Sequence, residues 1–229
     1  MNKYSQYNNV KQKNIHIVLL LALAMLYVTC KLTCNPLFFR QSLFTIPFTH
    51  HQIRIVSSAF VYPAIYVISD AIVAVSNRMI TIFIIIIGVV CDGLFSGMTN
   101  LVTTLQMPHI NSLIQQANTN AVNQLGSQFW QLYYHGVIAA LTAAILEVLI
   151  FSFIFRKSRN FFISTIASVI IVLLAHNTIA DYPLLKSDPN ALTIIFNGIG
   201  MNVSVMAIYA ALISVVLLIV KRLDLKAKQ

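Results

Sequence analysis

Three acidic side chains in this sequence stand where acidic side chains are costly. The chain has only six Asp and Glu residues, and Asp70, Asp92 and Glu147 each fall inside a long apolar segment. A charged side chain at the centre of a bilayer costs about 2.5–3.5 kcal/mol on insertion scales, so it faces the protein interior and needs a partner. The middles of these segments hold no Lys or Arg. We therefore expect the three acids to be protonated, hydrogen-bonded, or reserved for a cationic or donor-rich ligand.

Asp70 is the strongest candidate for a binding residue. In a helix it shares a face with Tyr66 and Pro63, which precede it by four and seven residues. A proline inside a membrane helix frees a backbone carbonyl and can kink the helix, which is a common way to open a site. Tyr62 and Tyr66 add aromatic faces and hydroxyl groups beside the carboxylate. The cluster predicts a site for a donor-rich small molecule.

Asp92 and Glu147 each allow two interpretations. Asp92 precedes Gly93 in the stretch GLFSG, whose two glycines permit close helix contact. Asp92 therefore either caps or bridges helices, or belongs to a functional polar core. Glu147 either snorkels toward Arg156 or Lys157 near the end of its segment, or joins the same polar core, where unpaired acids can relay protons.

Four further residues are candidates for the walls or the polar rim of such a site. His176 and Asn177 form either a satisfied packing pair or part of the same cavity. Asn202 follows two glycines in the stretch FNGIGMN, where glycine allows close approach or a local break of the helix. Trp130 begins an apolar segment together with two tyrosines, and this aromatic group is either an interfacial belt or a cavity wall.

The elements that carry these residues are membrane spans. The chain is 58% hydrophobic and only 9% charged, with a mean hydropathy of +0.80, whereas soluble domains carry roughly 25% charged residues. A span needs about 20 mostly apolar residues. The sequence predicts one all-α domain over residues 1–229, with six spans at about 15–33, 55–75, 79–105, 129–155, 161–185 and 192–220.

The distribution of basic residues predicts the orientation. With both termini in the cytoplasm, eleven of the 15 Lys and Arg residues fall on the inner side and four on the outer side, as expected for a membrane protein. The net charge of +9 then reflects topology, and we expect no nucleic-acid partner. The segment Gln106–Gln128 lacks Asp, Glu, Lys and Arg, and we expect an outer loop there that partly covers a cavity. Nothing in the sequence indicates a metal site or a cofactor.

The stretch FVYPAIYVISDAIVAV, residues 60–75, resembles the signature of the VUT family of vitamin-uptake-like membrane proteins, which includes the queuosine-precursor transporters. Residues 129–168 are similar to the fourth span, the basic inner loop and the start of the fifth span in that family. The order and lengths of the spans fit over nearly the whole chain. The residues that match the signature are Phe60, Tyr62, Pro63, Tyr66, Ser69 and Asp70.

The chain departs from the family pattern at several positions. His176 and Asn177 stand where an aspartate and a threonine are usual, and Gly200 or Asn202 lies near the place of a lysine common in the sixth span. Val73–Ala74 and the two residues after Val75 also replace a usual glutamate and Tyr-Gly pair. The resemblance is therefore to a divergent member.

The resemblance implies a six-helix fold similar to the substrate-binding components of energy-coupling-factor transporters, and no enzymatic activity. It implies a secondary transporter that imports a 7-deazaguanine such as preQ0 or preQ1 across a bacterial inner membrane, with protons as a candidate coupling ion. Asp70 would accept two N–H donors from the ring edge. Aromatic walls would come from Tyr62, Tyr66 or Trp130, and further polar contacts from His176, Asn177 or Asn202.

A second interpretation is a substrate-binding module that docks on a separate ATP-driven complex. That interpretation predicts a docking surface of small residues on the fourth span, at Ala139–Ala140 and Ala143–Ala144.

Overall fold

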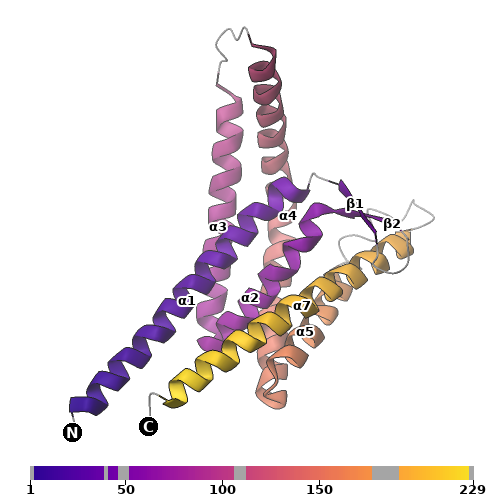
Figure 1. Cartoon of the computed structure of the whole chain (residues 1–229). Coiled ribbons are helices and arrows are strands. Elements are labelled where there is room, and N and C mark those ends of the chain that lie inside the picture. The colour runs from indigo at the N-terminus through magenta and orange to yellow at the C-terminus, as the bar shows by residue number, and fades with distance from the viewer. Residues whose placement is uncertain (1–2, 39–40, 46–51, 106–111, 177–190, 227–229) are drawn as a thin grey trace.

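The computed structural model describes residues 3–38, 41–45, 52–105, 112–176 and 191–226. Within these residues the chain forms helices and one short hairpin of strands (Figure 1). The helices are α1 (Lys3–Phe38), α2 (Tyr62–Val75), α3 (Arg78–Thr103), α4 (Leu113–Ser158), α5 (Phe161–His176) and α7 (Ala191–Lys226). A single 3₁₀ turn, η1 (Ser57–Phe60), precedes α2.

The expected all-α polytopic membrane fold is confirmed. Five helical segments are long and apolar enough to cross a bilayer: His16–Leu37, Ser57–Val75, Arg78–Thr103, Leu113–Ser158 and Ile199–Arg222. A sixth apolar helix, Phe161–Ala175, is shorter, and the rest of the predicted fifth span lies outside the described residues. The helices alternate in direction, so the beginning of α1 and the end of α7 lie at the same end of the bundle (Figure 1).

The described core surrounds α2. This helix buries one unbroken stretch, Ile65–Ile72, and packs against α1, α3, α4, α5 and α7. Phe151 of α4 and Met206 of α7 are among the fully buried side chains of this core. Many large apolar side chains on the outer faces are instead exposed, as expected where lipid replaces water as the solvent.

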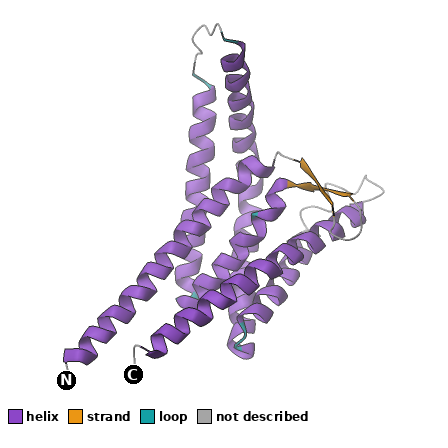
Figure 2. Cartoon of the chain, viewed as in Figure 1, coloured by secondary structure: helices purple, strands orange, loops and turns teal. Residues whose placement is uncertain are grey.

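The segment between α1 and α2 differs from the prediction. Strands β1 (Gln41–Thr45) and β2 (Gln52–Val56) pair antiparallel, with Gln41 opposite Val56, and stand beside the ends of the helices (Figure 2). The predicted second span therefore begins too early, because residues 55–56 belong to β2. Pro63 also lies in the first turn of α2, where its missing N–H is not needed for the helix. The expected kink within the span is wrong.

The expectation of an outer loop over residues 106–128 is wrong for residues 113–128, which belong to α4. Residues 113–128 of that segment are helical and continue without a break to Ser158, for 46 residues in all. At 1.5 Å per residue α4 is about 69 Å long, roughly twice the hydrocarbon thickness of a bilayer. Its first half projects past the other helices together with the end of α3 (Figure 1). We call residues 93–103 and 113–128 the arm.

Glycine allows the close packing of the arm. A Cβ at Gly126 would lie only 2.9 Å from the backbone oxygen of Thr99, and one at Gly93 would overlap the Tyr133 ring. The Ser112 side chain caps the start of α4 by accepting from the backbone N–H of Gln115. This polar, uncharged segment thus begins with a capped helical turn and packs closely on α3 at Gly126.

Candidate functional site

Asp70 and Glu147 form a pair of carboxyl groups in the centre of the bundle. Both residues have no exposed surface. Helix α2 packs against α4 here, and the two carboxyl groups are close enough to interact electrostatically. Glu147 Oε1 accepts a hydrogen bond from Ser168 Oγ of α5 at 2.8 Å. Among the described residues, both oxygens of Asp70 and Oε2 of Glu147 have no hydrogen-bond donor.

Small hydroxyl side chains make room for this pair. Helix α5 contributes Thr165 and Ser168, both fully buried. Thr165 lies beside the Asp70 carboxyl. Its Oγ1 forms no hydrogen bond in the closed arrangement of the described chain. On α2 the neighbouring Ser69 donates to the backbone oxygen of Tyr66 at 2.8 Å. The result is an oxygen-rich seam between three helices in an otherwise apolar core.

The snorkelling interpretation of Glu147 is therefore wrong. Arg156 and Lys157 are exposed at the end of α4, and Lys157 Nζ lies 4.4 Å from the centre of the Phe153 ring. Glu147 instead points into the core because α4 places it beside the buried residues Val148 and Phe151.

Asp92 has the opposite surroundings. Its Oδ2 lies 3.5 Å from Lys31 Nζ, and its Oδ1 accepts a hydrogen bond from Asn35 Nδ2. Lys31 and Asn35 belong to α1 and Asp92 to α3, so the carboxylate bridges two helices. The expectation that the buried acids lack a cationic partner is wrong here, because α1 continues to Phe38 and carries Lys31 inside the bundle.

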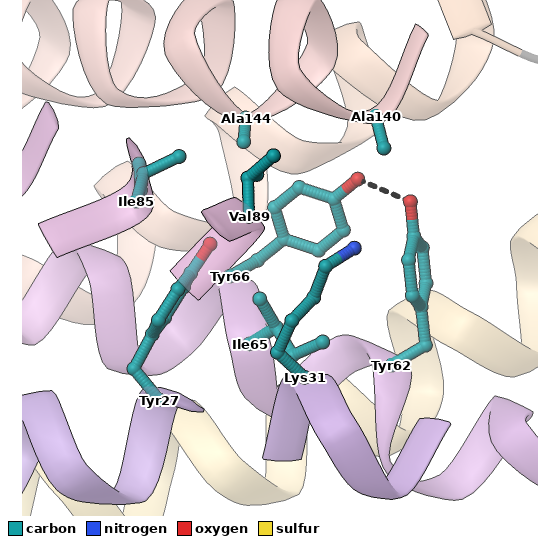
Figure 3. A pocket seen from close by; sticks show the side chains of 9 residues that line it. All are labelled: Tyr27, Lys31, Tyr62, Ile65, Tyr66, Ile85, Val89, Ala140 and Ala144. Atoms are coloured by element: carbon teal, nitrogen blue, oxygen red, sulfur yellow. Dashed lines mark hydrogen bonds between the residues drawn. The ribbon is translucent and has the colours of Figure 1, made fainter. Parts of the chain in front are cut away.

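A cavity lies among α1, α2, α3 and α4 (Figure 3). Tyr27 and Lys31 of α1 face it from one side, and Ala140 and Ala144 of α4 from the other. The remaining lining comes from α2 and α3: Tyr62, Ile65, Tyr66, Ile85 and Val89. The cavity volume is about 20 Å³, which is enough for one water molecule.

Two tyrosines of α2 close one side of the cavity. The hydroxyl oxygens of Tyr62 and Tyr66 are 2.7 Å apart, within hydrogen-bond distance. Their rings meet edge to face, with centroids 5.2 Å apart. Tyr66 is almost fully buried, whereas Tyr62 is half-buried.

The cavity is one helical turn from both acidic sites. Tyr66 precedes Asp70 by four residues on α2, and Ala144 precedes Glu147 by three on α4, so each pair shares a helix face. Lys31 lines the cavity and also binds Asp92. Asp70 itself is enclosed below Tyr66 and is not among the residues that line the cavity.

The structure does not bring every candidate residue to this cavity. Trp130 stacks on Tyr133, with centroids 6.0 Å apart, and is 40% exposed in α4 toward the arm. Asn202 of α7 is half-buried, and its Oδ1 has no partner among the described residues. His176 ends α5, and its side chain lies outside the described part of the structure, as does all of Asn177.

Sequence reasoning missed Tyr27 and Lys31, both of which line the cavity. A signal was present, because Tyr27, Lys31 and Asn35 recur every four residues and therefore share one helix face. The predicted end of the first span at residue 33 placed Lys31 at the membrane surface and hid this polar stripe.

Comparison with protein families gives one match. The model of the family described as "Putative vitamin uptake transporter" matches residues 57–220, which is most of the chain. The matched region contains the tyrosine pair of α2 and all three buried acids, whereas α1 precedes it. No curated protein and no solved structure matches the chain. With its helical membrane fold, the chain belongs to this family of vitamin-uptake-type membrane transporters.

Proposed function

We propose that the chain imports a flat, nitrogen-rich heterocycle, a queuosine precursor such as preQ0 or preQ1, as a secondary transporter. The family match supports uptake of a vitamin-type molecule. The observation that carries the proposal further is the cavity, in which three tyrosines converge from α1 and α2 opposite two alanines of α4. Aromatic faces opposite small side chains make a slot for a planar ring.

The polar groups of the cavity suit a guanine-like ring. The Lys31 ammonium can donate to the ring carbonyl, as lysine does to the same oxygen of guanine. The hydroxyls of Tyr62 and Tyr66 can accept from ring N–H groups once their mutual contact opens. Asp70, which the sequence suggested as the reader of the donor edge, lies one turn deeper than these groups.

The small volume indicates how the transporter must move. A site for a small organic ligand occupies about 300 Å³ or more, whereas this cavity has about 20 Å³. Binding therefore requires the Tyr62–Tyr66 hydroxyl contact to open and Lys31 to leave Asp92. Because the Lys31–Asp92 ion pair joins α1 to α3, we expect α1 to move outward when the substrate enters.

We propose that the chain works without an ATPase partner, in a bacterial inner membrane with both termini in the cytoplasm. Docking on an ATPase complex would need the small-residue surface predicted on the fourth span. Ala143 is buried, and Ala140 and Ala144 line the cavity, so three of those four alanines are turned inward. This inward arrangement supports a chain that works alone.

Uptake by the purified chain in liposomes tests the proposal. Labelled preQ0 and preQ1 are supplied separately, with each unlabelled compound as competitor. We expect Tyr66→Ala to reduce the initial rate at limiting substrate by at least about 5-fold, because stacking on a base contributes about 1–3 kcal/mol. Tyr134→Ala is the matched control, since Tyr134 also lies in a membrane helix but is 69% exposed.

Two results would contradict the proposal. If wild-type liposomes take up neither compound, the substrate is not a queuosine precursor of this kind. If Tyr66→Ala and Tyr134→Ala lower uptake equally, the tyrosines of the cavity do not hold the substrate.

A further inference from the structure

The carboxyl pair of α2 and α4 raises a question that substrate binding leaves unanswered. Asp70 and Glu147 are fully buried side by side, and three of their four oxygens have no donor among the described residues. Apart from the hydroxyls of α5, the residues next to them along α2 and α4 are apolar, with Ala71, Ile72 and Val148 all fully buried. Two ionised carboxylates in such a place repel each other and lack hydration, so one carboxyl must carry a proton.

We propose that Asp70 and Glu147 share one exchangeable proton and form the site at which proton binding is coupled to transport. This inference deepens the proposed function, because it rests on the chain being a transporter. It does not depend on which heterocycle is carried.

The positions of the oxygens show how the proton is held. Glu147 Oε1 is occupied by the donor Ser168, which leaves Oε2 to accept from a protonated Asp70. The unpartnered Thr165 hydroxyl lies beside Asp70 and can donate to its second oxygen. One proton thus gives every oxygen of the pair a hydrogen bond. When the proton leaves for water, two carboxylates remain and repel each other.

The surrounding elements contribute no charge that could replace the proton. The titratable groups facing the pair are the phenols of Tyr66 on α2 and Tyr27 on α1, and α5 contributes only hydroxyls. On α3, Asp92 is already held by α1. On α7, the Tyr209 hydroxyl donates to the backbone oxygen of Phe60 at 2.8 Å. These statements hold for the described residues.

The carboxyl pair and the cavity lie on the same two helices, α2 and α4. Opening of the cavity is therefore coupled to the separation of the two carboxyl groups. Tyr66 and Asp70 lie on one face of α2, and Ala144 and Glu147 on one face of α4. Widening the slot between Tyr66 and Ala144 therefore also separates the two carboxyl groups one turn deeper. An open cavity exposes the pair to water and lets the proton exchange, whereas the closed form shown here requires the proton.

Infrared spectroscopy of the purified chain in lipid tests the site without any substrate. The carbonyl stretch of a protonated carboxyl group, identified by its shift in D₂O, is expected in the wild type at neutral pH. Asp70→Asn and Glu147→Gln should each shift this band, because the hydrogen-bond partner changes, and the double variant should lose it. Asp92→Asn is the matched control and should leave the band in place.

Transport then tests the coupling, with labelled preQ1 as the probe. We expect Glu147→Gln to lose accumulation driven by a pH gradient while exchange of labelled for unlabelled preQ1 continues. If the chain carries no preQ1 at all, the proposed substrate is wrong, but the infrared result still decides whether the pair holds a proton. A wild-type band that survives in the double variant overturns the proposal. A band that disappears on adding Na⁺ also overturns it, because the pair would then be a sodium site.

Discussion

Two acidic sites lie near the same cavity, and their buried carboxyl groups have opposite surroundings. Asp92 is neutralised by Lys31 and hydrogen-bonded by Asn35, all from this chain. The polar groups beside Asp70 in the described part of the chain are a second carboxyl group and hydroxyls. The first site is complete in itself and ties α1 to α3. The second, in the proposal above, is completed by a proton, and release of that proton would change its charge during transport.

The two sites also differ in how they relate to the family. Residues 57–220 match the family model, and both members of the carboxyl pair lie within them. The ion pair needs Lys31, which lies in α1 before the matched region.

Removing the cation should have the largest effect on stability. Lys31→Met leaves Asp92 as an unpaired charge, and breaking a buried ion pair costs about 3–5 kcal/mol. We expect the lower part of that range, since the Lys31 side chain is 18% exposed. Thermal unfolding in detergent measures the effect. The double variant Lys31→Met/Asp92→Asn should recover most of the loss, and a double variant as unstable as the single one would show that Lys31 acts by packing alone.

Removing a hydroxyl beside the carboxyl pair should have an intermediate effect. Ser168→Ala deletes the donor to Glu147 Oε1, and hydrogen bonds between membrane helices contribute about 0.6 kcal/mol on average and up to about 1.7 kcal/mol. The free energy of unfolding should therefore decrease by an amount within that range. Ser204→Ala is the control, because Ser204 is exposed and bonds only within α7. Equal losses in the two variants would contradict the assigned role of Ser168.

Removing one carboxylate of the pair should change stability least. Glu147→Gln keeps the shape of the side chain, and its amide oxygen can accept from a protonated Asp70 as the Glu147 carboxylate does. We therefore expect the free energy of unfolding to change by less than about 0.6 kcal/mol, the value of one interhelical hydrogen bond. The comparison of the two sites fails if Glu147→Gln destabilises the protein as much as Lys31→Met does.

Much of the fold could be predicted from the sequence, because apolar segments of bilayer length carry a strong signal. The location of the buried acids also followed, since each lies inside such a segment. The ends of the helices could not be predicted from the sequence. Residues 113–128 lack both charge and an apolar stripe, so the sequence carried no strong helix signal there, and the close approach of Gly126 to α3 is a tertiary contact. Pro63 suggested a kink within a span, but a proline in the first turn of a helix does not bend it, and α2 begins at Tyr62.

The candidate site was predictable only in part. The stretch around Asp70 marked α2 as important, and the cavity does contain Tyr62 and Tyr66. The partner of Asp70 could not be found, because the contact between Asp70 and Glu147 joins residues 77 positions apart on different helices. Which helices pack side by side is a tertiary property that spacing along one helix does not contain.

The continuity of α4 has a practical consequence. A membrane protein of 25.6 kDa offers little mass outside the bilayer for aligning particle images. The arm stands clear of the bundle, and α4 runs from it to Ser158 as one helix. An antibody fragment raised against residues 113–128 would therefore be joined firmly to the helix that carries Ala144 and Glu147. Such a fragment would serve as an orientation marker for electron microscopy of the open and closed forms.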